Sequence, residues 1–286
     1  MGIRPLLLIL ATLASGPLVS AASGHPASAA YLGFDRNDYP GDAALNALHQ
    51  TFSYSGYWLN IPPGAKTNSW TGKRLTLQSA GFGFLVLFNG RTYAEIKQSG
   101  DAVKLGRSDA SVAVQAALSE GFPWQTIVFL DQEQGGRLLP EQRAYLHAWV
   151  DGVTAAHFAA GVYCSGIAAK ESPGVSVITA EDIQRNAGQR KINYWIVNDA
   201  CPPSPGCTIS RKDLSPRASG ISFADVWQYS QSPKRPDFAR GCSATYNHDG
   251  NCYSPNAVSS HDPAHRLYID LDIASSRDPS HGRTQN

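Results

Sequence analysis

The chain has 286 residues, is 42% hydrophobic and carries a formal net charge of +1. A net charge so close to zero gives no electrostatic basis for binding nucleic acid or an anionic membrane. The first residues include one positive charge, at Arg4. An apolar run over residues 5–13 follows, and it is too short to span a bilayer. Small residues at 19–21 and 27–29 suit cleavage, so residues 1–29 are predicted to be a signal peptide. The mature protein is expected to be monomeric and either secreted or periplasmic.

Short apolar runs alternate with helical patterns along the rest of the chain. Strands are expected at residues 31–35, 54–59, 82–88, 126–131, 160–164, 192–197, 226–229 and 267–273. Helices are expected at residues 43–50, 71–80, 108–121, 141–158 and from 179 onward. This alternation indicates a parallel sheet with right-handed crossovers, and eight strands close into a barrel. We therefore predict a single (β/α)8 barrel over residues 30–273, followed by a polar, disordered tail over 274–286.

The cysteines lie mainly in two long, irregular loops. Cys201 and Cys207 flank a Pro- and Gly-rich loop after the sixth strand, and Cys242 and Cys252 flank a polar loop after the seventh. An exported protein can oxidise both pairs, so two disulfides are predicted. Cys164 is interpreted as a buried free thiol, with a catalytic nucleophile as the weaker alternative. Neither these cysteines nor the loop histidines have the spacing of a known metal site, so no metal is predicted.

The strand ending at residue 131 carries the main candidate for chemistry. The apolar run Ile127-Val-Phe-Leu-Asp131 is followed by Gln132 and Glu133, and Gly135-Gly136 then breaks the pattern. Side chains alternate along a strand, so Asp131 and Glu133 are expected on one face. Mutual repulsion should raise the pKa of one, which would place a proton donor beside an anion. A salt-bridged or helix-capping pair is the structural alternative.

Further polar and aromatic residues are expected at the same end of the barrel. In barrels of this kind, active-site residues lie at the carboxyl ends of strands. Acids are predicted at this rim at Asp35, Asp131, Glu133, Asp199, Asp270 and Asp272. Candidate substrate-binding residues are Trp58, Asn89, Trp195, Asp199, Trp227, Gln228 and Tyr229. Acid pairs with aromatic rings suit glycoside hydrolysis, whereas ordinary barrel packing is the alternative for each ring.

Four strand-end motifs occur in a characteristic order: Gly33-Phe-Asp35, Leu130-Asp-Gln-Glu133, Trp227-Gln-Tyr-Ser230 and Ile269-Asp-Leu-Asp272. With them the chain, from about residue 31 to 273, resembles a glycoside-hydrolase-like barrel family related to glycoside hydrolase family 25 lysozymes. The resemblance implies that Glu133 is the general acid and that Asp131 stabilises developing positive charge. It further implies that Asp35 positions substrate or water, and that Asp270 or Asp272 is the strand-eight acid.

The resemblance implies a cell-wall polysaccharide or peptidoglycan as substrate, and no cofactor. The chain departs from the lysozymes at Arg36-Asn37-Asp38, which replaces a Ser and Gln neighbourhood, and in the large loop before the last strand. A catalytically inactive, glycan-binding barrel is therefore the alternative function. A metal-dependent hydrolase using the rim carboxylates is a third possibility, and the lack of histidine near the strand ends counts against it.

Overall fold

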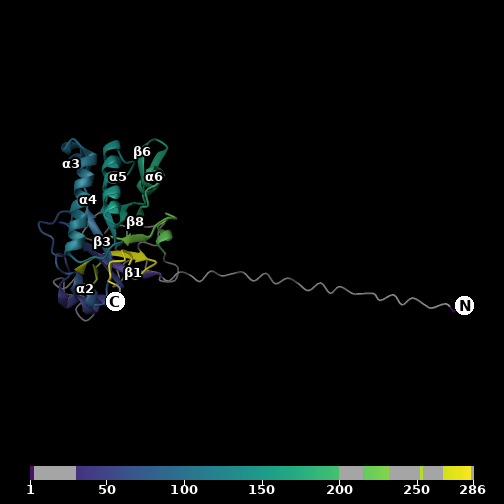
Figure 1. Ribbon diagram of the computed structural model, residues 1–286, viewed down its shortest axis with the longest axis horizontal. Helices are drawn as coiled ribbons and strands as arrows, with labels where there is room; N and C mark the ends of the chain where they lie inside the picture. Colours follow the sequence, from purple (N-terminus) through teal and green to yellow (C-terminus); the bar gives the residue numbers. More distant parts are fainter. Residues whose placement is uncertain (3–29, 200–214, 232–251, 254–266, 285–286) are drawn as a thin grey trace.

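The computed structural model describes residues 1–2, 30–199, 215–231, 252–253 and 267–284 (Figure 1). The predicted signal segment and both predicted disulfide pairs fall wholly or partly outside these residues. Cys164 is buried and free, as expected. None of the helices in the described ranges is long and apolar enough to cross a membrane.

Eight strands form a closed barrel, which confirms the predicted strand number and closure. Their order around the barrel is β1-β12-β9-β8-β5-β4-β3-β2. The barrel strands are β1 (Tyr31–Asp35), β2 (Tyr54–Trp58), β3 (Gly83–Asn89), β4 (Ile127–Asp131), β5 (Ala159–Ser165), β8 (Asn193–Val197), β9 (Val226–Ser230) and β12 (Asp270–Ala274).

Helices connect the first six barrel strands and cover the outside of the barrel. They are α1 (Leu45–His49) after the short 3-10 turn η1 (Asp42–Ala44), α2 (Arg74–Ser79), α3 (Tyr93–Ser99), α4 (Ala102–Ser119), α5 (Pro140–Ala155) and α6 (Thr179–Asn186). The long helices α4 and α5 pack side by side (Figure 1). A second 3-10 turn, η3 (Pro216–Ser219), precedes β9.

Both faces of the barrel strands are buried, with alternate side chains facing inward and outward. Phe88 of β3 faces α5, where its ring centre lies 6.5 Å from that of Trp149. Phe129 of β4 faces the barrel interior, where its ring centre lies 6.0 Å from that of Trp195. Strands buried on both sides read as continuous apolar runs, which is why the sequence pattern located them.

The expected uniform parallel order is wrong for the last strand. β12 runs antiparallel to both of its neighbours, β1 and β9. A parallel strand needs a crossover that carries the chain back to the opposite end of the sheet. Because β9 ends at the same rim where β12 begins, an antiparallel β12 needs no such crossover.

Two smaller ladders add to the barrel. The hairpin of β6 (Ala168–Ser172) and β7 (Val175–Ile178) follows β5 and was not expected from the sequence. A short antiparallel ladder joins β10 (Cys252–Tyr253) to β11 (Leu267–Tyr268), so the expected eighth strand at 267–273 divides into two elements.

The chain end expected to be a disordered tail is bonded to the barrel. Ala274 belongs to β12, and the following segment inserts between the amino-terminal ends of β3 and β4. The Val86 amide donates to Ser280 Oγ at 2.8 Å, and the Ile127 amide donates to the Ser280 carbonyl at 2.8 Å. The polar composition of this segment suggested disorder. In the fold, however, its polar groups accept hydrogen bonds from strand amides that would otherwise lack partners.

Candidate active site

The barrel brings the predicted acids to one rim. Asp35 and Asp131 are the last residues of β1 and β4, and parallel strands present these ends together. Because β12 is antiparallel, its first residue, Asp270, lies at the same rim and pairs directly with Asp35. Asp272 pairs with Gly33, one step deeper along the same face. Asp270 and Asp272 therefore share a face, as expected, although the strand runs in the opposite direction.

A hydrogen-bonded network links three strands near Asp35. The Gln228 amide nitrogen donates to Asp35 Oδ2 at 2.8 Å. The Tyr163 hydroxyl donates to Gln228 Oε1 at 2.8 Å, and Gln231 donates to the same oxygen at 3.1 Å. Each side chain fixes the next, so the Asp35 carboxyl is held in one orientation within a buried setting.

Asp272 forms the deepest part of the site and is fully buried. The Trp195 indole N–H donates to Asp272 Oδ1 at 3.0 Å. Burial, and then the neighbouring Asp35 carboxyl, hold the pKa of Asp272 well above its usual range. A hydrogen bond between the Asp35 and Asp272 carboxyls also raises the pKa of Asp272, because such a bond requires a proton on one of the two acids. The two acids therefore form one buried, interacting pair.

Asp131 and Glu133 lie at the end of β4 with different exposure. Asp131 is buried, whereas Glu133, two residues beyond the end of the strand, is exposed. The backbone is fixed on both sides of Glu133. The Gln132 amide donates to the Tyr163 carbonyl at 3.0 Å, and Gln134 Oε1 accepts from the Tyr93 amide at 2.8 Å. Glu133 is thus a solvent-accessible acid on an anchored segment.

Both residues open into one pocket of about 620 Å³ above the ends of β2, β3 and β4. Its lining includes Asn89, Asp131 and Gln132. Gly90 allows this arrangement, because a Cβ at that position would lie 2.4 Å from the Asp131 carbonyl oxygen. The predicted residues Asn89, Asp131 and Glu133 are therefore brought together, and β4, which ends at Asp131, is adjacent to β5 of the buried network.

The predicted aromatic residues are placed differently from the expectation. The rings of Trp58, Trp195, Trp227 and Tyr229 are all at most 3% exposed. The Trp58 indole donates to the Arg36 carbonyl and the Trp227 indole to the Asn198 carbonyl. In the part of the chain that the structure describes, these rings are buried in the barrel, which fits the packing alternative better than a sugar-stacking role. The acid that follows β8, Asp199, is also buried.

Several site residues were missed by sequence reasoning. Tyr163 and Gln231 complete the network around Asp35, and Tyr54 places a buried hydroxyl near Asp272 and Asp35. Tyr163 lies at an inward-facing position near the end of β5, so strand alternation could have identified it. Arg91 lines the pocket from the loop after β3, and its partner Asp109 was read as a helix start instead.

Residues 63–200 match the sequence model of the Rv2525c-like, glycoside hydrolase-like domain. The matched region is glycoside hydrolase-like. The match confirms the resemblance drawn from the strand-end motifs, and the region includes Asn89, Asp131 and Glu133. A search of curated protein sequences finds no match.

Several solved structures are similar to this chain. A protein of B. stearothermophilus is 17% identical, with a TM-score of 0.51, and the alignment covers 85% of this chain and 95% of that one. The Tat-secreted protein Rv2525c of Mycobacterium tuberculosis is 12% identical, with a TM-score of 0.49 and coverage of 89% and 98%. A family 25 glycosyl hydrolase from Bacillus anthracis is 11% identical, with a TM-score of 0.46 and coverage of 86% and 89%.

Proposed function

We propose that this chain is an exported glycoside hydrolase that cleaves a cell-wall or other polysaccharide, with Glu133 as the general acid. One observation carries the proposal. An exposed acid, Glu133, and a buried acid, Asp131, line the same pocket within the glycoside hydrolase-like region. Two carboxyl groups in one pocket, one exposed to solvent and one buried, form the kind of pair that glycosidic bond cleavage uses.

In the proposed reaction, Glu133 gives its proton to the glycosidic oxygen as the bond from that oxygen to the anomeric carbon breaks. The leaving sugar departs as an alcohol, and Asp131 stabilises the positive charge left on the anomeric carbon. A water molecule then adds its oxygen to that carbon and returns a proton to Glu133. Neither acid is consumed in the cycle.

Asp35 is proposed to position substrate or water at the floor of the site. Its carboxyl accepts a hydrogen bond from Gln228 and lies against Asp272, so its direction is set by the protein before substrate arrives. Asp272 is fully buried, whereas Asp270 is partly exposed. We therefore assign the role of strand-eight acid facing substrate to Asp270, and a positioning role to Asp272.

The proposal is tested by measuring reducing ends released from peptidoglycan and from other glycans. Glu133→Gln keeps the shape of the side chain but cannot donate the proton, so activity should fall about 10²- to 10⁴-fold. Glu181→Gln is the matched control, because Glu181 is an exposed acid on α6 outside the pocket. Equal activity of wild type and Glu133→Gln would contradict the assignment of Glu133.

The second candidate is a glycan-binding barrel without catalysis, and the burial of Asp35 and Asp272 favours it. Asp35 and Asp272 are 5% and 0% exposed and bonded to each other, so they are not free to activate water. This candidate is supported if the wild type binds glycans, releases no reducing ends, and binds equally well after Glu133→Gln.

A further inference from the structure

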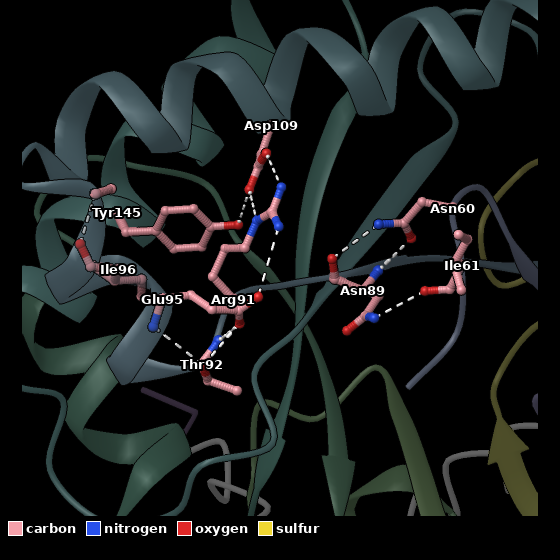
Figure 2. Close-up of polar contacts among 10 residues, drawn as sticks. Asn60, Ile61, Asn89, Arg91, Thr92, Glu95, Ile96, Asp109 and Tyr145 are labelled. Carbon is pink, nitrogen blue, oxygen red and sulfur yellow. Dashed lines mark hydrogen bonds and ion pairs between the residues drawn. The ribbon is translucent and has the colours of Figure 1, made fainter. Parts of the chain in front are cut away.

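Arg91 stands in the same pocket as Glu133, on the wall formed by the loop after β3. Its Nε and Nη2 donate to the two carboxylate oxygens of Asp109 at 2.8 and 2.9 Å (Figure 2). Asp109 comes from α4, and the Tyr145 hydroxyl of α5 donates to it at 2.9 Å. Two helices therefore hold this arginine in one orientation.

The two partners of this ion pair differ in exposure. The Asp109 side chain is 4% exposed, whereas the Arg91 side chain is 40% exposed. The remaining nitrogen, Nη1, lies 3.8 Å from a Glu95 oxygen, which is too long for a hydrogen bond. Within the described residues, Nη1 makes no hydrogen bond. A guanidinium fixed on its inner edge and open on its outer edge is prepared to bind an acceptor.

The other walls of the pocket indicate what kind of ligand it accepts. Ile61 and Val112 line it and are 48% and 51% exposed, and Pro62 and Pro63 lie beside Ile61. The loop that carries Ile61 is held in place, because the Asn89 amide nitrogen donates to the Ile61 carbonyl at 2.9 Å (Figure 2). A rigid apolar wall opposite planar polar groups suits a sugar ring, which has an apolar face and a polar edge.

The charges of the pocket exclude acidic sugars. Asp109 neutralises Arg91, and Glu95, whose pKa is lowered by hydrogen bonds from Thr92, adds a negative charge to the lining beside the carboxyl group of Asp131. An anionic ligand would be repelled by the Glu95 carboxylate, while Asp109 already compensates the charge of Arg91. Arg91 therefore suits a neutral oxygen acceptor, such as a hydroxyl or carbonyl, and not a carboxylate.

We propose that this pocket is a subsite for an uncharged sugar unit of the glycan, and that Arg91 is its specificity-determining residue. Nη1 donates to an oxygen of that unit, while the apolar wall contacts the ring. Asp109 and Tyr145 are positioning residues that act through Arg91. The proposal rests on the proposed function, because it places this unit beside the bond presented to Glu133.

The test is the affinity of the mature protein for oligosaccharides of two to six units, measured by titration calorimetry. Glu133→Gln serves as the background, so that turnover does not consume the ligand. The probes are cello- and chito-oligosaccharides, which are uncharged, and oligogalacturonides, which are acidic. Arg91→Gln should weaken binding of an uncharged probe about ten- to hundredfold, as expected for a lost charged hydrogen bond. Arg107→Gln, an exposed arginine of α4 outside the pocket, should leave it unchanged.

A double variant, Arg91→Gln with Asp109→Asn, removes the ion pair without leaving a buried charge unpaired. The double variant should bind the uncharged probes as weakly as Arg91→Gln does. A cooperative thermal unfolding transition should show that it is folded. If uncharged probes bind and both variants match the background, the subsite is wrong while the proposed function stands. Tighter binding of oligogalacturonides than of uncharged probes also overturns the proposed subsite. If no probe binds and no glycan is cleaved by the wild type, the proposed function itself fails.

Discussion

Asp272 is an acid in a place where an ionised acid is unfavourable. It is fully buried, close to Asp35, and its one donor from the described residues is the Trp195 indole. A single neutral donor does not replace the water that an ionised carboxylate loses on burial. A proton between the two acids removes this cost and gives Asp35 a fixed donor. Asp272 therefore contributes to the site as a neutral acid.

The raised pKa of Asp272 makes stability depend on pH. In the unfolded chain this acid ionises near pH 4, whereas in the folded protein it keeps its proton to higher pH. The folded state binds more protons across that window, so stability falls as pH rises through it. Asp272→Asn keeps an oxygen for Trp195 and cannot ionise. We expect its stability relative to wild type to increase from pH 4 to pH 8.

Thermal melting at closely spaced pH values checks this prediction. Asp38→Asn provides the control, because Asp38 is an exposed acid. Melting curves of Asp272→Asn and wild type that shift in parallel with pH would show that Asp272 does not hold its proton in the folded state.

At the scale of elements, the packing of α4 against α5 sets the position of the pocket arginine. The sequence indicated a helix beginning at Ser108 or Asp109, whereas α4 begins at Ala102 with Asp101 as its cap. Asp109 is thus in the middle of a helix, where it bonds to Arg91 and Tyr145. Gly106 lets the two helices approach, because a Cβ there would lie 2.4 Å from the Tyr145 carbonyl oxygen.

Gly106→Ala should separate α4 from α5 and move Tyr145 away from Asp109. We expect a loss of about 1–3 kcal/mol in the free energy of unfolding, as in other overpacked cores. Affinity for uncharged oligosaccharides should also fall, because Arg91 loses its fixed orientation. Ser108→Ala, on the exposed side of the same helix, is the control for both measurements. Unchanged stability and affinity would mean that the helices tolerate the added methyl group.

The sequence allowed the barrel and part of the site to be predicted, for identifiable reasons. Apolar runs and helical periodicity located the eight strands, and strand-end acids such as Asp131 marked the rim. Strand direction was not predictable, because the periodicity of β12 is the same whether it runs up or down. The partners of Asp109 and Gln228 come from distant parts of the chain, and no local pattern encodes those contacts. Burial of Trp58 and Trp227 likewise depends on which loops fold over them.

At the scale of the whole molecule, residues 275–284 hold together strands from the first half of the chain. Asp278 Oδ1 accepts from the Phe84 amide at 2.8 Å, and Ser280 bonds to both β3 and β4. Arg74 of α2 is buried and donates to the Gly282 carbonyl at 2.7 Å. The segment thus fills the gap between β3 and β4 at the end of the barrel opposite the pocket.

Ser280→Ala should destabilise the whole barrel, because the buried Val86 amide loses its acceptor. An unsatisfied buried amide costs about 1–3 kcal/mol, which should lower the melting temperature by several degrees. The measurement is chemical denaturation of Ser280→Ala beside the wild type. Ser275→Ala is the control, because Ser275 is an exposed serine of the same segment. Equal midpoints for Ser280→Ala and wild type would show that this contact adds nothing to stability.

The contact of Ser280 with Val86 joins residues 194 positions apart in the chain. During synthesis, β3 and β4 are complete long before residue 280 is added. Until then, the amides that bond to Ser280 in the folded protein have no acceptor from this segment. Joining such distant segments is entropically costly and slow. The barrel should therefore close in a late, concerted step. Until then, the amides of Phe84, Val86 and Ile127 lack the partners that residues 278–280 provide.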